Sequence, residues 1–234
     1  MPCRLSIVLP AYNEEGNIER AVRDAAAAGA LLGVSYQVVA VDDGSRDGTR
    51  AILERLSQEM GDALRLERFE ENQGYGAALR AGFRAAEGEI LFFTDSDNQF
   101  DLTELVGVLP LIEDHDAVFG YRIDRRDPAL RRFTSRTFNG LVSLVFGLSV
   151  RDLNCSFKLF RRQRLDTLEL VSNDFFIDTE LVARIHLAKW RYTQVGVHHF
   201  PRAAGISTVR TSDVPRTLLS LARMWLRLRA PVRA

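Results

Sequence analysis

The feature that most constrains the fold is a regular alternation of short apolar runs with longer segments of helical periodicity. The apolar runs have the length and composition of buried β-strands, and the segments between them have apolar residues at helical spacing. Strands that alternate with helices predict an α/β fold, in which a mostly parallel sheet carries helices on both faces. The predicted strands of the first half are residues 5–9, 36–41, 64–69, 90–93 and 117–120, and the predicted helices are residues 13–30, 49–60, 74–86 and 101–112.

The pattern changes after residue 120. With 234 residues, 46% of them hydrophobic, the chain can build one substantial core. It shows no internal repeat, low-complexity segment or linker. We therefore expect one domain over residues 1–210 and a C-terminal helical extension over residues 211–234. The elements predicted beyond residue 120 are a helix at 138–146, a strand at 156–160, a helix at 179–187 and a strand at 192–197.

The charges divide unevenly along the chain, although the formal net charge is zero. Residues 1–120 hold 10 arginines against 22 aspartates and glutamates, whereas residues 121–234 hold 21 basic against 9 acidic residues. A basic half suits phosphates, either on a substrate or on a membrane surface. Because this half shows no interleaved aromatic residues and no nucleic-acid motif, no nucleic-acid partner is expected.

The sequence also indicates a compartment. Cys3 and Cys155 lie far apart and form neither a disulfide framework nor a zinc pattern, which fits a reducing environment. The N-terminus leads directly into the first predicted strand, without a signal peptide. No apolar run reaches the ~20 residues that span a bilayer. These features predict a cytoplasmic protein.

Asp95 and Asp97 follow the predicted strand at residues 90–93. They are expected at the carboxyl end of that strand, on the edge where ligands bind in an open α/β sheet. Their oxygens suit a hard divalent cation that a substrate phosphate shares. The alternative is turn and capping chemistry, which explains Asp101 as the N-cap of a helix and Glu104 as its capping-box partner.

Six short motifs stand in order along the chain and together resemble family 2 glycosyltransferases over about residues 4–210. The resemblance is strongest to the dolichyl- or polyprenyl-phosphate sugar synthase branch, although Ser156 stands where that branch usually has Gly. It implies a GT-A fold and an inverting transfer of a sugar from a nucleotide diphosphate. The motifs are Pro10-Ala11-Tyr12-Asn13-Glu14-Glu15, Asp42-Asp43-Gly44-Ser45, Asp95-Ser96-Asp97-Asn98-Gln99, Gly120-Tyr121-Arg122, residues 152–160 and residues 202–207.

The resemblance assigns the nucleotide-sugar donor to the ends of the first two predicted strands. Asp42 and Asp43 would accept the imide N–H of uracil or guanine, or a ribose hydroxyl, and the alternative for both is a turn. Pro10 and Tyr12 would pack on the base. Glu14 would hold the ribose or brace the loop, and its alternative is a first-turn acid that the helix dipole favours.

The resemblance also implies a metal and a phosphate clamp. Asp95 and Asp97 would hold Mg²⁺ or Mn²⁺ against the diphosphate, with Gln99 as a further ligand, so that the cation neutralises the departing nucleoside diphosphate. Arg122 and the arginines of residues 125–136 would bind phosphates bidentately. The alternative for that arginine run is a solvated loop. The predicted donor-binding set is completed by Ser96 and Arg131.

The resemblance leaves two kinds of acceptor open. A lipid phosphate is already ionised near neutral pH, and Arg202 and Arg131 would position it. A hydroxyl acceptor needs a carboxylate to take its proton, and the candidates are Asp178 and Glu180. Capping of the helix that begins there is the alternative for Asp178. Polyprenyl phosphate is the preferred acceptor, although Thr208 stands where the branch commonly has Lys.

Residues 215–229 predict a basic amphipathic helix with a tryptophan on its apolar stripe. Such a helix can lie on an anionic membrane surface, here the inner face of the cell membrane. The alternative is a terminal helix that packs on its own domain. The apolar stripe consists of Leu218, Leu221, Ala222, Trp225 and Leu228, and the basic residues elsewhere are Arg216, Arg223 and Arg227.

Other functions fit parts of the pattern. The same fold can transfer a sugar to a hydroxyl of a glycan or a small molecule. A sugar-phosphate nucleotidylyltransferase would need a Gly-rich loop after the first strand, where Pro10 and Ala11 stand instead. A non-catalytic nucleotide-sugar-binding module would be favoured by loss of the acidic ligands, but Asp95 and Asp97 are present. We therefore expect a metal-dependent hexosyltransferase.

Overall fold

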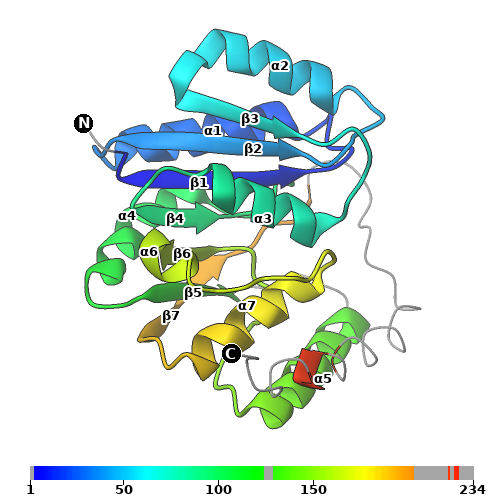
Figure 1. Cartoon of the computed structure of the whole chain (residues 1–234), viewed down its shortest axis with the longest axis vertical. Helices are drawn as coiled ribbons and strands as arrows, with labels where there is room; N and C mark the ends of the chain where they lie inside the picture. Colours follow the sequence, from blue (N-terminus) through cyan, green and yellow to red (C-terminus); the bar gives the residue numbers. More distant parts are fainter. Residues whose placement is uncertain (1–2, 124–128, 203–220, 222–223, 227–234) are drawn as a thin grey trace, which may run out of the picture.

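The computed structural model describes residues 3–123, 129–202, 221 and 224–226, with the backbone alone for residues 129–136. Within these ranges the chain forms a seven-stranded sheet between two layers of helices (Figure 1). The strands are β1 (Leu5–Ala11), β2 (Tyr36–Asp42), β3 (Leu64–Arg68), β4 (Ile90–Phe93), β5 (Ala117–Ile123), β6 (Lys158–Arg161) and β7 (Tyr192–His198). The α-helices are α1 (Ile18–Leu31), α2 (Thr49–Met60), α3 (Tyr75–Ala85), α4 (Leu105–Val108), α5 (Ala129–Phe146), α6 (Arg162–Leu165) and α7 (Phe176–Leu187).

The strand order confirms the predicted, mostly parallel sheet. The order is β3-β2-β1-β4-β6-β5-β7. The first four strands of this order pair in parallel, and β5 pairs in parallel with β7. Only β6, among the strands of the described ranges, runs antiparallel to its neighbours β4 and β5. The carboxyl ends of β1, β2 and β4 consequently lie at one edge of the sheet.

Helices cover both faces of the sheet, as the sequence predicted. In β4, Ile90 and Phe92 face the layer that contains α1, α2 and α4, whereas Leu91 and Phe93 face the layer that contains α3, α5 and α7. All four side chains are buried. Strands that are covered on both faces need apolar side chains at every position, which explains why β4 is a continuous apolar run.

The first helix begins later than predicted, at Ile18 rather than near Asn13. Asn13 has a φ of 55°, a left-handed conformation that does not continue into a helix. Its backbone N–H donates to Ser45 Oγ at 3.0 Å, and its side-chain oxygen accepts from the Arg46 N–H at 2.8 Å. The loop after β1 is therefore shaped by the turn after β2, a contact that the local sequence does not reveal.

The predicted helix at 101–112 is divided into a 3₁₀ turn at Leu102–Glu104, the short α4, and a 3₁₀ segment at Leu109–Glu113. Pro110 lies at the start of the last piece, and proline disrupts the hydrogen bonding of a continuous α-helix. Asp101 caps the first turn as predicted, because its carboxylate accepts from the Thr103 N–H at 2.9 Å. The capping-box role of Glu104 is wrong, since its carboxylate instead accepts from the backbone N–H of His198.

The C-terminal region is described only in part. The predicted boundary at residue 210 and most of the predicted helix at 215–229 lie outside the described residues. Leu221 and Met224 are buried, and both belong to the same core cluster as Val142 of α5. At these two positions the terminal segment packs on its own domain. Among the described ranges, none of the helices combines the length and apolar character that a membrane span requires.

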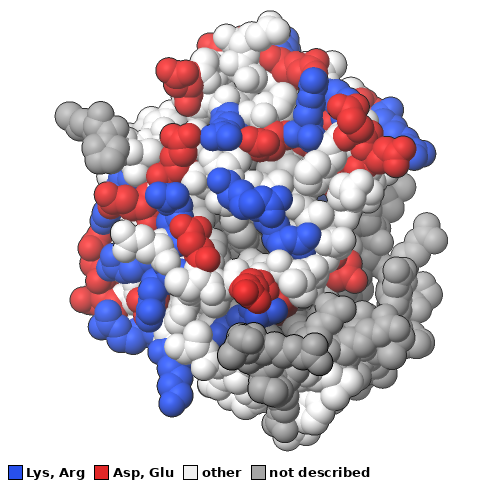
Figure 2. All heavy atoms as spheres, viewed as in Figure 1, with Lys and Arg blue, Asp and Glu red and all other residues white. Residues whose placement is uncertain are grey.

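Charged side chains of both signs are interleaved over the face shown in Figure 2. Many form ion pairs within the acidic N-terminal half, such as Arg20 with Asp24 and Arg55 with Glu59. Exposed pairs of this kind each stabilise a protein by about 0–1 kcal/mol. On the described part of this face, the uneven division of charge along the sequence therefore produces no large region of a single sign.

The N-terminal turn of α3 makes an unusually close approach to the loop before α7, and we expect Gly76→Ala to destabilise the protein. A Cβ at Gly76 would lie 2.3 Å from the Ser172 carbonyl oxygen and 2.9 Å from the Asn173 carbonyl carbon. Overpacking of this kind costs about 1–3 kcal/mol. The loss should appear as a lower urea midpoint, whereas Gly107→Ala, with no atom within 4 Å of the new Cβ, should not lower it.

Candidate active site

Three parallel strands end at one edge of the sheet, and the predicted site residues follow them there. β1 and β2 end level with each other, since Ala11 pairs with Asp42, and β4 leads into Asp95. The buried Ser96 donates from Oγ to the carbonyl oxygen of Pro10 at 2.7 Å. This bond ties the loop after β4 to the end of β1, so the predicted metal and donor residues are brought to the same place.

Asp95 and Asp97 form an acidic pair on the loop after β4. Burial and the negative charge of Asp95 raise the pKa of Asp97 to about 7. Asp95 accepts hydrogen bonds from the Tyr75 hydroxyl at 2.9 Å and from Ser156 Oγ. Two carboxylates whose charges repel one another in a partly buried site are the kind of arrangement that a divalent cation relieves.

Arg202, which follows β7, lies beside Asp97 and Glu14. Its guanidinium donates to Glu14, and its Nε lies 3.7 Å from an Asp97 carboxylate oxygen. Glu14 also accepts from Asn17 Nδ2 at 2.6 Å, and burial raises its pKa. Arg202 was predicted at the acceptor phosphate and Glu14 at the ribose, and the structure brings the two together beside Asp97.

Gln99 is tied to the segment that leads to Arg202. Its Nε2 donates to the Phe200 carbonyl oxygen at 2.8 Å, and the Phe200 N–H donates back to the Gln99 carbonyl oxygen at 2.8 Å. His199 packs edge-on against Phe100, with ring centroids 5.2 Å apart. The loop after β4 is thus paired with the end of β7, and the role of Gln99 as a metal ligand stays a prediction.

Asp42 and Asp43 are both enclosed by protein donors. The Asp42 carboxylate accepts from the Ser45 N–H at 3.0 Å and from Arg50 Nε at 2.9 Å. The Asp43 carboxylate accepts from the backbone N–H groups of Gln73 at 2.7 Å and Gly74 at 3.0 Å, and from Asn72 Nδ2 at 2.9 Å. The bond from Ser45 to Asp42 is the turn chemistry that the sequence left open as the alternative, whereas Asp43 instead binds the segment that leads into α3. A direct contact of either carboxylate with a nucleotide stays a prediction.

Tyr12 follows β1 directly and is half-buried, whereas Pro10 is buried within the strand. Since β1 and β2 end level with each other, Tyr12 lies near the end of the strand pair that was predicted to hold the nucleotide. Packing of Tyr12 on a base stays a prediction.

Arg122, at the carboxyl end of β5, is held by Asp152. Its Nε and Nη2 donate to the two Asp152 oxygens at 2.7 and 2.9 Å. The Arg122 side chain is only 10% exposed. A bidentate pair of this kind fixes the plane of the guanidinium. The phosphate role of Arg122 stays a prediction.

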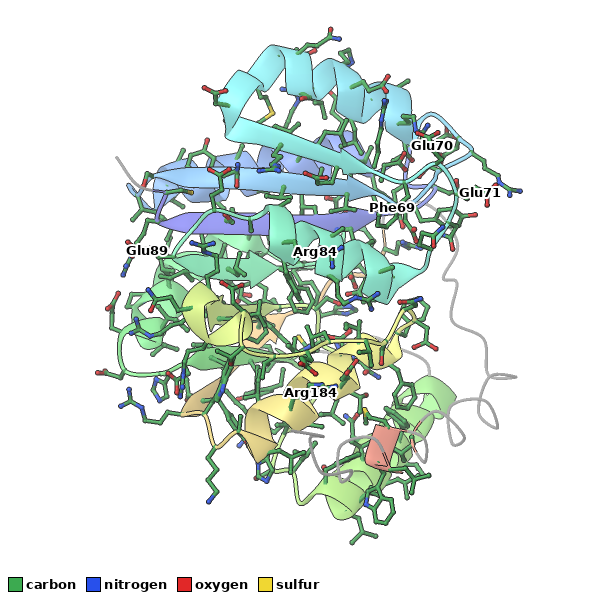
Figure 3. The ribbon with its side chains drawn as sticks, viewed as in Figure 1. Phe69, Glu70, Glu71, Arg84, Glu89 and Arg184 are labelled. Atoms are coloured by element: carbon green, nitrogen blue, oxygen red, sulfur yellow. The ribbon has the colours of Figure 1, made fainter. Side chains whose placement is uncertain are left out.

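The two candidate bases differ because residues two apart on a helix point in different directions. Asp178 is buried, and one of its oxygens accepts from Lys158 Nζ at 2.6 Å. Burial raises the pKa of Asp178, and Lys158 opposes this rise. Glu180 accepts from the N–H groups of Val171 and Ser172 and from Arg184 Nε at 2.9 Å. Glu180 thus holds the loop before α7 and pairs with Arg184 on α7 itself (Figure 3), and its role as a base stays a prediction.

The remaining predicted residues lie outside the described part of the chain. Arg125 and Arg126 precede α5, and the side chains of Arg131, Arg132 and Arg136 on that helix are not described. Thr208 also lies outside the described ranges. Their roles stay predictions.

A groove of 540 Å³ opens beside the loop that follows β3, where Figure 3 shows Phe69, Glu70 and Glu71, with Arg84 on α3. No residue of the predicted site lines it. The lining residues are Phe69, Glu70, Glu71, Gln73, Ala77, Arg80, Arg84 and Asn173.

The residues present fit a divalent cation only together with a substrate. Across the described ranges, no three His, Cys, Asp or Glu side chains gather as a metal cluster. Asp95 and Asp97 supply two carboxylates, which is the number of protein ligands that Mg²⁺ commonly takes when phosphate oxygens and water complete its shell. The pair therefore suits a cation that arrives with a diphosphate.

Solved glycosyltransferases share this fold. Glucosyl-3-phosphoglycerate synthase from Mycobacterium tuberculosis superimposes with a TM-score of 0.72 and 19% identity, over 96% of this chain and 79% of that chain. This likeness shows that the chain has the GT-A fold of these glycosyltransferases. The family model described as Glycosyl transferase family 2 matches residues 6–169, and the chain belongs to that family.

Two curated relatives are longer than this chain. It is 33% identical to Glycosyltransferase AglD of Haloferax volcanii over 235 residues, covering 95% of this chain and 36% of that protein. It is 32% identical to the undecaprenyl-phosphate 4-deoxy-4-formamido-L-arabinose transferase of Pseudomonas aeruginosa over 165 residues, covering 70% of this chain and 49% of that protein. The chain spans about a third to a half of the length of these two relatives.

Several contacts around Asp95 and Asp178 were not predicted from the sequence. Tyr75 was read only as part of a helix, and Ser156 and Lys158 only as part of a motif. The available signal was the polar character of Lys158 within the apolar run that ends at Phe160, since a buried lysine needs a charged partner. No local signal identified Tyr75 as the partner of Asp95.

Proposed function

We propose that the chain is a metal-dependent, inverting glycosyltransferase that moves a sugar from a nucleoside diphosphate sugar, of the GDP-mannose or UDP-glucose type, to a polyprenyl or dolichyl phosphate. The observation that carries this proposal is the partly buried pair Asp95 and Asp97 at the carboxyl edge of the sheet. The Pseudomonas relative is named for transfer to undecaprenyl phosphate, and one Mycobacterium synthase structure contains Mn²⁺ and UDP (TM-score 0.70, 20% identity). Both support the proposal.

Five residues of the site have the following roles in this proposal. Asp95 and Asp97 hold Mg²⁺ or Mn²⁺, which when bound neutralises charge on the leaving nucleoside diphosphate. Arg202 stands beside Asp97 and supplies a second positive group for a phosphate of donor or acceptor. The end of β1, with Pro10 and Tyr12, provides the surface for the nucleobase.

A phosphate acceptor agrees with the state of the candidate bases. Asp178 is paired with Lys158, and Glu180 is occupied by backbone N–H groups and Arg184. A hydroxyl acceptor would need a carboxylate that is able to take a proton, whereas an ionised phosphate needs none. With such an acceptor, we propose a cytoplasmic enzyme that acts peripherally at the inner face of the cell membrane.

Calorimetric titration of UDP-glucose and GDP-mannose, each with and without Mn²⁺, tests the donor site. Metal-dependent binding of one donor is the expected result, and it identifies the nucleotide. If neither donor binds with or without Mn²⁺, the donor assignment is wrong. The matched acceptor test compares polyprenyl phosphate with the corresponding polyprenol, and transfer to the alcohol alone would contradict the phosphate acceptor.

We expect Mn²⁺-dependent donor binding to weaken as the pH falls through about 7. Asp97 must be ionised to bind a cation, and its pKa is raised to about 7. One pH unit below this pKa the affinity should fall by about 10-fold, with about one proton released per cation bound. Calorimetry in two buffers of different ionisation enthalpy measures both quantities, and a flat profile between about pH 6 and 8 would contradict the assignment.

A further inference from the structure

Each oxygen of the Asp95 carboxylate accepts a hydrogen bond from the hydroxyl of a different segment of the chain. The Tyr75 hydroxyl, on the first residue of α3, donates to Oδ1 at 2.9 Å. Ser156 Oγ, from the segment before β6, donates to Oδ2. A carboxylate oxygen has two lone pairs, so an oxygen that accepts one hydrogen bond still has a lone pair for a cation. The two hydroxyls therefore restrict the carboxylate without using up its ligand capacity.

Tyr75 is itself held firmly. Its ring stacks on Phe175, with centroids 5.2 Å apart and planes inclined by 23°. The preceding Gly74 has a φ of 97°, and a Cβ there would lie 2.3 Å from the Asn173 carbonyl oxygen. Only glycine fits such a position, so the direction in which the chain enters α3 is fixed.

Asp43 secures the same entry to α3 from the other side. Its carboxylate accepts from the N–H groups of Gln73 and Gly74 at 2.7 and 3.0 Å, and from Asn72 Nδ2. A chain of contacts consequently runs from Asp43 at the end of β2, through the first residue of α3, to Asp95 at the end of β4. This chain gives Asp43 a definite function that needs no contact with a ligand.

Ser156 is fixed by its buried neighbours. Cys155 and Phe157 are fully buried, and the Phe157 ring packs against Phe92 of β4 with centroids 4.6 Å apart. The carbonyl oxygen of Cys155 accepts from Lys158 Nζ at 2.6 Å. The backbone that presents Ser156 Oγ to Asp95 therefore has little freedom to move.

We infer that Tyr75 and Ser156 are positioning residues that orient the Asp95 carboxylate for the catalytic cation, an inference that rests on the proposed metal-dependent function. Groups that hydrogen-bond a metal ligand from behind set its orientation, and their loss typically lowers metal affinity by about 10- to 100-fold. The two hydroxyls act on the same carboxylate, so their effects should not be additive.

The test measures binding of Mn²⁺ alone, and of Mn²⁺ with UDP, by calorimetry on Tyr75→Phe, Ser156→Ala and the double variant. Each single variant should bind Mn²⁺ about 10-fold or more weakly, whereas the melting temperature should change little because phenylalanine keeps the stacking on Phe175. Ser156→Thr, which keeps a hydroxyl, should restore affinity toward the wild-type value. Two control variants also lose a hydroxyl, but away from the site: Tyr36→Phe, at the start of β2, and Ser57→Ala, on α2. Both should bind Mn²⁺ as the wild type does.

The outcomes separate this inference from the proposed function. Wild-type affinity in Tyr75→Phe and Ser156→Ala would overturn the positioning role while leaving the metal site intact. A lower melting temperature with unchanged affinity would also overturn it, because the hydroxyls would then serve only stability. A wild-type protein that binds no Mn²⁺, with UDP or without it, would overturn the proposed metal site and this inference together.

Discussion

Asp97→Asn is expected to abolish metal-dependent donor binding and, at the same time, to stabilise the metal-free protein. Asparagine keeps the shape of the side chain but removes the charge that the cation needs, so the affinity for Mn²⁺ with UDP should fall by about 100-fold or more. Turnover should fall in parallel. Calorimetric titration and a transfer assay measure the two losses, and retention of full activity would contradict Asp97 as a metal ligand.

The stabilisation follows from the raised pKa of Asp97. A carboxyl whose pKa is higher in the folded than in the unfolded protein costs stability where it is ionised in both states, here above about pH 7. A shift from 3.8 to about 7 corresponds to at most about 4 kcal/mol. The gain in Asp97→Asn should therefore be largest above pH 7 and disappear as the pH falls toward 4.

A melting curve at about pH 8 should show a rise of about 2–8 °C for Asp97→Asn, and at about pH 4 the rise should vanish. Asp101→Asn is the matched control, because Asp101 caps a helical turn, a role that asparagine fills equally well. It should change neither donor affinity nor melting temperature. If Asp97→Asn lowers the melting temperature at pH 8, the ionised carboxylate is instead a stabilising group, and its pKa is not raised.

Lys158→Met is expected to cause the largest loss of stability of any single change considered for this chain. Lys158 is fully buried, and its Nζ donates to Asp178 and to the Cys155 carbonyl oxygen, both at 2.6 Å. Removing it leaves the buried Asp178 charge uncompensated, which typically costs about 3–5 kcal/mol. Urea denaturation at neutral pH should show this loss as a lower midpoint with an unchanged slope.

The pH dependence of this loss has a definite sign. Burial already raises the pKa of Asp178, and removal of Lys158 should raise it further. The cost is present while Asp178 is ionised and falls away as the pH drops below its folded pKa. The double variant Lys158→Met, Asp178→Leu should recover most of the stability, because both charges are then gone. Arg20→Met, which breaks an exposed pair with Asp24, is the control and should cost less than about 1 kcal/mol.

The sequence alone determined the elements of the sheet. The apolar run at β4 and the ends of β2 and α2 were predicted within one residue of their observed bounds. This was possible because a strand buried on both faces consists of apolar residues, which are visible in the local sequence. The acidic pair was equally visible, because polar residues directly after an apolar strand must lie at its carboxyl end. The start of α1 was misplaced, because Asn13 belongs to a loop that residues 45 and 46 shape.

Only the tertiary structure decided which side chains meet. Asp95 accepts hydrogen bonds from Tyr75, 20 residues before it, and from Ser156, 61 residues after it. Glu14 and Arg202, which form an ion pair, are 188 residues apart. Periodicity reports whether a residue is buried, but it carries no information on strand order or on which loops share an edge. Once the order β2-β1-β4-β6 brings these loops together, desolvation selects the pairings, because each buried charge or hydroxyl must find a partner.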